Sequence, residues 1–121
     1  MISALFVVCG KGCYDVQPCS STAEILMKLA IAQINCTLGD LAGNAAKILD
    51  HAVRAKEQGA TLLLTPELSL CGYPPEDLLL RDGFYQACEA TLLDLASQVQ
   101  GITVVVGHPH EVAGERYNAA S

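Results

Sequence analysis

A glutamate that follows an apolar stretch is the residue of this sequence best suited to chemistry. Glu67 comes shortly after the run 61–64, Thr-Leu-Leu-Leu, which has the composition of a buried strand. A carboxylate at such a place must be hydrated, paired or protonated, because burial of an unpaired charge is costly. Ligands of open α/β sheets bind at the carboxyl ends of the strands. Glu67 is therefore a candidate general base or acid, and the alternative is a carboxylate that orders the turn by accepting backbone hydrogen bonds.

The segment after Glu67 predicts a stiff turn that carries an aromatic side chain. Residues 72–75 read Gly-Tyr-Pro-Pro, so Tyr73 stands between a flexible residue and two rigid ones. Its ring either lines a pocket or covers the end of the sheet, and the spacing favours neither. Glu76 and Asp77 follow at the expected start of a short helix, where acidic side chains commonly stabilise the helix N-terminus.

Four other residues have chemically useful side chains, but each has a simpler interpretation. Cys71 lies close enough to Glu67 in sequence to be a nucleophile beside a base, yet a buried cysteine that packs on a sheet is more common. His108 and His110 have no third metal ligand near them in sequence, so we expect no metal site there. Asn44, near the start of a predicted helix, is interpreted as a capping residue.

Composition and charge limit the possible functions. The chain has 121 residues, of which 51% are hydrophobic and 17% charged, with a net charge of −6 and a pI near 4.8. This length suits one modest domain, and the absence of a basic stripe argues against a nucleic-acid partner. The apolar run 2–8 is too short to span a bilayer, so we expect no membrane partner. Six cysteines without a Cys-x-x-Cys pair in a regular α/β pattern indicate reduced thiols and a cytoplasmic location.

The first part of the sequence differs from the rest. Residues 9–26 show no clear period, whereas a clean strand pattern begins directly after Met27. We therefore expect residues 1–26 to be an extension outside the fold and residues 27–121 to form the domain. The alternatives are a signal or lipoprotein anchor, and an extra strand on the sheet edge.

From residue 28 onward, strand and helix patterns alternate. This β-α-β-α-β order predicts an α/β fold with a parallel sheet and right-handed crossovers. Strands that are apolar on both sides need cover on both faces, which two helices do not supply, so a partner or further sequence should cover the rest. The expected strands are 29–34, 61–65 and 102–106, and the expected helices are 41–58, 76–80 and 84–99. We expect the segment 107–110 to end the third strand and a hairpin to start within 111–121.

Several segments together resemble a known family. The opening is similar to that of the nitrilase, or carbon–nitrogen hydrolase, superfamily, and the region around Glu67 is similar to the glutaminase domain of glutamine-dependent NAD synthetases. The resemblance excludes residues 1–26. It is carried by Lys-Leu-Ala-Ile-Ala-Gln-Ile-Asn (28–35), Leu-Gly-Asp-Leu-Ala-Gly-Asn (38–44), Thr-Pro-Glu-Leu (65–68), Gly-Tyr-Pro-Pro-Glu-Asp-Leu-Leu (72–79), Val-Val-Gly-His-Pro (105–109) and Tyr-Asn-Ala-Ala (117–120).

The resemblance implies a specific chemistry. The family uses a Glu-Lys-Cys triad, in which Glu67 matches the general base that activates the cysteine for attack on glutamine. Tyr73 matches a position that lines the glutamine pocket. The released ammonia would serve a synthetase domain that amidates deamido-NAD with ATP and magnesium, whereas no cofactor is expected in the present chain. The family also implies a homo-oligomer and an α-β-β-α sandwich, of which residues 27–121 would form the beginning.

The sequence also departs from the family pattern. The family lysine and cysteine come later in the chain order, and neither Cys71 nor Cys88 stands in the nucleophile motif. We therefore expect an N-terminal fragment that is inactive alone. Two alternatives stay open: a fragment of another carbon–nitrogen hydrolase, such as an amidase or nitrilase, and a non-catalytic α/β interaction domain in which Glu67 is structural.

Overall fold

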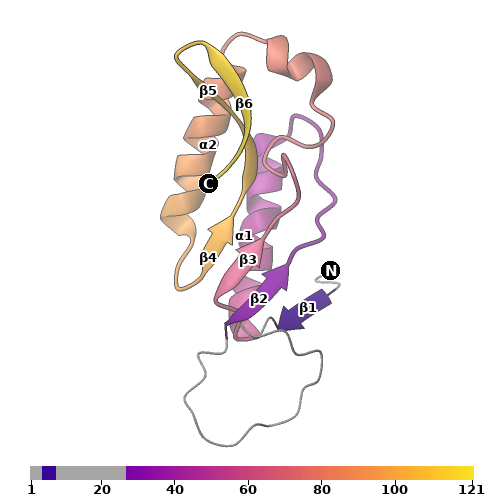
Figure 1. Ribbon diagram of the computed structural model, residues 1–121, viewed down its shortest axis with the longest axis vertical. Helices are drawn as coiled ribbons and strands as arrows, with labels where there is room; N and C mark the ends of the chain where they lie inside the picture. Colours follow the sequence, from indigo (N-terminus) through magenta and orange to yellow (C-terminus); the bar gives the residue numbers. More distant parts are fainter. Residues whose placement is uncertain (1–3, 8–26) are drawn as a thin grey trace, which may run out of the picture.

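The computed structural model describes residues 4–7 and 27–121, and a four-stranded sheet runs through it (Figure 1). The strand order is β1-β2-β3-β4, with parallel pairing of β2 to β3 and of β3 to β4. Its strands are β1 (Ala4–Val7), β2 (Lys28–Ile31), β3 (Leu62–Leu64) and β4 (Thr103–Val105). The parallel core of the sheet and the β-α-β-α-β order confirm the predicted fold class.

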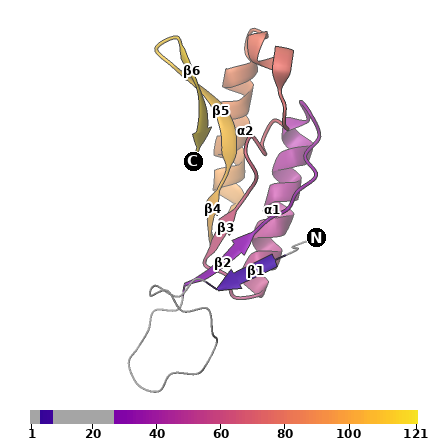
Figure 2. The same cartoon turned by 45° about the vertical axis from the view of Figure 1, so that its right-hand side comes forward.

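Two helices lie side by side and pack on the sheet (Figure 2). They are α1 (Leu41–Glu57) and α2 (Phe84–Gln98). Asp40 begins α1, because its carboxylate accepts a hydrogen bond from the backbone N–H of Gly43 at 3.0 Å. Asp40 is therefore the N-cap of α1. Arg54 and Lys56 lie in the last turn, where their positive charges interact favourably with the partial negative charge of the helix C-terminus.

The apolar core lies between the sheet and the helices. Ala30 of β2 and Leu63 of β3 are fully buried, and each has partly exposed neighbours on both sides along its strand. This alternation puts one face of the sheet against the helices and leaves the other face partly exposed among the described residues. Fully buried side chains in this core include Ile48, Ala52, Ala55, Leu70, Cys71 and Cys88.

A hairpin follows the sheet. The third strand ends before segment 107–110, as expected, but that segment also begins a new strand that was not predicted. This strand is β5 (Gly107–Val112), and it pairs antiparallel with β6 (Glu115–Ala120). Pro109 is compatible with this because β5 is bonded to β6 alone among the described strands, and proline is tolerated on such edges. The turn at Ala113 and Gly114, both with positive φ, closes the hairpin as expected.

The extension before Met27 is described only in part. Residues 4–7 form β1, which pairs antiparallel with β2 and so occupies its outer edge. These four residues belong to the segment for which an extra edge strand was one of the alternatives. Residues 8–26 lie outside the described part of the chain. The division at residue 27 stays a prediction.

A short connection links the site region to α2. The segment Glu76–Leu80 forms a 3₁₀ helix, η1, at the position where a short helix was expected.

Within the described residues, no helix is both long enough and apolar enough to cross a membrane.

Candidate active site

The loop that carries Glu67 begins at the carboxyl end of β3 and is packed tightly against the start of β5. Gly107 lies directly beneath it: a Cβ there would come within 2.6 Å of the Leu68 backbone N and 2.7 Å of the Pro66 carbonyl O. The Leu70 N–H donates to the Gly107 carbonyl at 3.1 Å. Since both obstructing atoms belong to the backbone, only glycine at position 107 leaves the glutamate loop in place.

Asn118 contacts the candidate base directly. Its amide Nδ2 donates to Oε1 of Glu67 at 2.5 Å, and both side chains are exposed. The partner of the carboxylate is therefore a side-chain amide from β6, and not the backbone N–H groups that the turn-ordering alternative requires. The sequence analysis missed Asn118, whose only signal was its place in the Tyr-Asn-Ala-Ala segment of the family resemblance.

Two hydroxyl groups hold the ends of the loop together. Thr65 donates its hydroxyl to the Val105 carbonyl at 3.0 Å and accepts from the Ser69 hydroxyl at 2.6 Å. Thr65 thus links the end of β3 to β4 and to the far side of the loop. Glu67, at the centre of this short segment, projects from a backbone that is fixed on both sides.

Asn44 connects this region to the first helix and corrects its expected role as a cap. The side chain is fully buried. Its Oδ1 accepts from the Thr37 N–H at 2.8 Å, and its Nδ2 donates to the carbonyls of Thr37 at 2.8 Å and Leu70 at 3.1 Å. One amide therefore joins the loop before α1 to the segment that follows Glu67.

Tyr73 lies at the surface on the Gly-Tyr-Pro-Pro turn. Its side chain is 67% exposed, so it does not cover the end of the sheet. Gly72 brings this turn close to the loop before α1, where a Cβ would lie 2.8 Å from Leu38 Cα, and its φ of +85° also favours glycine. Among the described residues, the structure joins Glu67 to Asn118 and leaves Tyr73 free to meet a ligand from solvent.

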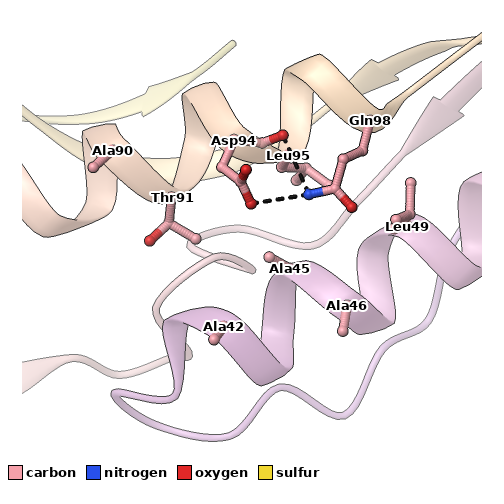
Figure 3. Close-up of a pocket in the computed structure, with 9 residues that line it drawn as sticks. All are labelled: Ala42, Ala45, Ala46, Leu49, Ala90, Thr91, Asp94, Leu95 and Gln98. Atoms are coloured by element: carbon pink, nitrogen blue, oxygen red, sulfur yellow. Dashed lines mark hydrogen bonds between the residues drawn. The ribbon is translucent and has the colours of Figure 1, made fainter.

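One depression lies near the candidate base and a cavity lies away from it. A wide-open depression of about 500 Å³ at the ends of β2 and β3 is lined by Thr65 and Pro66, the two residues before Glu67, and by the segment 31–35. Glu67 itself is not one of its lining residues. A cavity of about 420 Å³ lies between α1 and α2 (Figure 3). It is lined largely by alanines, and the pair Gln98 and Asp94 is hydrogen-bonded at 2.9 Å on its α2 side. The depression at the strand ends agrees with the expected binding edge of a parallel sheet.

The cysteines near the site are packing residues. Cys71 is fully buried, and its thiol approaches the Leu68 carbonyl at 3.6 Å. Burial raises the pKa of Cys71 to about 11 and that of Cys88 to about 12. Both thiols are thus protonated at neutral pH, which confirms the expected packing role of Cys71 and argues against it as a nucleophile.

We predict that these two thiols resist alkylation in the folded chain. At pH 8, iodoacetamide should label Cys36, which is half-buried, well before Cys71 or Cys88, because only thiolates react. The pKa of Cys36 is also raised by burial, but Lys47 partly offsets this effect. Peptide mapping by mass spectrometry measures the order, and labelling in urea is the control. Labelling of Cys71 as fast as Cys36 without urea would contradict the prediction.

His108 is a satisfied buried histidine. Its Nδ1 donates to the Pro109 carbonyl at 3.1 Å, and its Nε2 accepts from the Ser121 hydroxyl at 2.8 Å. Among residues 4–7 and 27–121, no group of three or more His, Cys, Asp or Glu side chains is placed to hold a metal ion. The described residues therefore do not fit a magnesium site.

The fold is that of a hydrolase family. Residues 28–121 match the family model of carbon–nitrogen hydrolases. This chain belongs to the carbon–nitrogen hydrolase family. Its relatives include the glutamine-dependent NAD(+) synthetase of Xanthomonas campestris, 41% identical over 84% of this chain and 19% of the relative, and that of Synechocystis, 47% identical over 73% and 16%. The chain thus spans less than a fifth of the length of these relatives.

Solved structures agree with this assignment. A glutamine-dependent NAD(+) synthetase from Cytophaga hutchinsonii superposes with a TM-score of 0.73 at 33% identity, over 78% of this chain and 16% of that chain. An amidase from Nesterenkonia sp. superposes with a TM-score of 0.65 at 35% identity, over 78% and 36%. These matches confirm the predicted resemblance to NAD synthetases and the nitrilase-type fold class.

Proposed function

We propose that this chain contributes the general base to the glutaminase site of a glutamine-dependent NAD synthetase. The observation that carries the proposal is Glu67, which is exposed after the carboxyl end of a parallel strand and is hydrogen-bonded by Asn118. The identity to NAD synthetases over most of the chain supports the same assignment.

The proposed chemistry assigns one proton acceptor to this chain. Glu67 takes the proton of a cysteine thiol that the family supplies later in its chain order. The thiolate attacks the amide carbon of glutamine, the carbon–nitrogen bond breaks, and the proton leaves with the departing ammonia. Water then hydrolyses the thioester to glutamate. The family lysine and backbone N–H groups would stabilise the oxyanion.

Tyr73 is proposed to line the glutamine pocket. Its exposed ring and its place on the turn that follows Glu67 support this role. The amide of glutamine is polar at one end and its side chain is apolar in the middle, which suits contact with a tyrosine ring.

The complete enzyme is proposed to be a cytoplasmic homo-oligomer with a synthetase domain. That domain would use ATP and magnesium to amidate deamido-NAD with the released ammonia. A related NAD(+) synthetase from Acinetobacter baumannii, 38% identical to this chain, was solved in complex with ADP, which supports the nucleotide.

A second candidate function is amide hydrolysis by a simpler carbon–nitrogen hydrolase. The Nesterenkonia amidase supports it, since it superposes on 78% of this chain at 35% identity. The higher TM-score with the synthetase favours the first proposal.

A domain-exchange experiment tests the proposed function. Residues 28–121 replace the matching segment of the Synechocystis synthetase, and NAD formation is measured with glutamine and, separately, with ammonia. We expect both reactions to proceed, because the exchanged segment supplies an equivalent base to the native lysine and cysteine. A chimera that uses ammonia but not glutamine would contradict the proposal.

A further inference from the structure

Asn118 makes the one hydrogen bond that the Glu67 side chain receives within the described residues. Its Nδ2 lies 2.5 Å from Oε1, which is short for an amide donor. A hydrogen bond to a charged group is stronger than one between neutral groups, and it opposes the rotamer freedom that an exposed glutamate otherwise has. The contact therefore favours one rotamer of Glu67.

The two partners sit on elements that are fixed relative to one another. Asn118 lies opposite Pro109 in the hairpin register, and Pro109 is buried. Gly107, two residues earlier on the same strand, packs against the backbone on both sides of Glu67. The hydrogen bond between Asn118 and Glu67 thus joins two backbone segments that other contacts hold in place.

The chemical nature of the donor also matters. An amide N–H is neutral, so it orients a carboxylate without neutralising its charge. A lysine at the same place would stabilise the anion more strongly and make it a weaker base. An aspartate would repel it. Among residues 4–7 and 27–121, only Oε1 is bonded, and Oε2 has no partner and can accept a proton.

We infer that Asn118 is a positioning residue that fixes the rotamer of Glu67 and directs Oε2 toward the proton it receives. The catalytic meaning of this role rests on the proposed function, but the orientation itself is a property of these two side chains.

The test is side-chain NMR of the 121-residue chain. In the wild type, the couplings about χ1 and χ2 of Glu67 should report one dominant rotamer. In Asn118→Ala and in the isosteric Asn118→Asp, these couplings should become averaged. Tyr117→Ala is the matched control, because Tyr117 is the adjacent residue, is 50% exposed and points to the opposite face of β6.

A reciprocal measurement covers the case in which an Asn118 variant disturbs the hairpin. In Glu67→Ala, the Asn118 side-chain amide proton should move upfield by loss of its charged acceptor. Averaged Glu67 couplings in the wild type, or unchanged couplings in both Asn118 variants, would overturn the inference, as would an unmoved amide proton. Neither readout requires turnover, so failure of the glutaminase proposal is seen separately in the chimera.

Discussion

Glu67→Gln in the Synechocystis chimera is expected to lower glutamine-dependent NAD formation by about 10²- to 10⁴-fold, the usual contribution of a general base. The replacement is isosteric, and the glutamine Oε1 can still accept the Asn118 hydrogen bond seen at Glu67. The variant therefore removes proton acceptance and preserves the geometry. Ammonia-dependent NAD formation should be unchanged, because it bypasses the amide hydrolysis.

Glu76→Gln is the matched control for that experiment. Glu76 is exposed and lies in the first turn of η1, where its charge serves the helix terminus. The glutamine-dependent and the ammonia-dependent rates of NAD formation should both stay within about twofold of those of the parent chimera, as for most surface substitutions. If Glu67→Gln retains the glutamine-dependent rate, another group accepts the proton and the proposed role of Glu67 is wrong.

The helices could be predicted closely because their end signals are local. Expected helices at 41–58 and 84–99 are found at Leu41–Glu57 and Phe84–Gln98. Asp40 caps the first, and Gly59 and Gly101 follow the two ends with positive φ. Each signal acts within a few residues of the end that it marks, so no tertiary contact is needed to recognise it.

The bounds of the strands were predicted less well, because a run of apolar residues indicates that the side chains are buried but not that the backbone pairs with another strand. The first strand was expected at 29–34, but β2 ends at Ile31. Ala32 remains buried and Ile34 packs on the core, so the apolar run continues after the ladder ends. The third strand does end before residue 107, but the start of β5 there was missed, because glycine and proline are turn signals in isolation and occupy an edge strand here.

The residues of the candidate site show the same difference between local sequence signals and contacts that depend on tertiary structure. Glu67 was found from the sequence because its position at the end of an apolar run is a local feature. Asn118 was not, because its contact with Glu67 depends on the register of a hairpin that returns to the sheet end. Asn44 was interpreted as a cap from its local position, whereas its partner Leu70 lies in a distant loop.

Asn44→Ala should lower the free energy of unfolding by about 2–4 kcal/mol, the sum of a small cavity and unpaired backbone groups. The Leu70 carbonyl lies in the buried part of the chain and loses the amide that reaches it, while Thr37 is exposed and can bond to water instead. Urea unfolding of the 121-residue chain measures the change as a lower midpoint at an unchanged slope.

Asn35→Ala separates this effect from the general cost of removing an asparagine near α1. Asn35 is exposed, and only its backbone carbonyl is bonded, to Lys47. Its replacement should change stability by less than about 0.5 kcal/mol. A loss below about 1 kcal/mol for Asn44→Ala would mean that water replaces the amide at Leu70. In that case Gly107 and Thr65, and not Asn44, hold the Glu67 loop, since their contacts at the β4–β5 side of the loop do not involve α1.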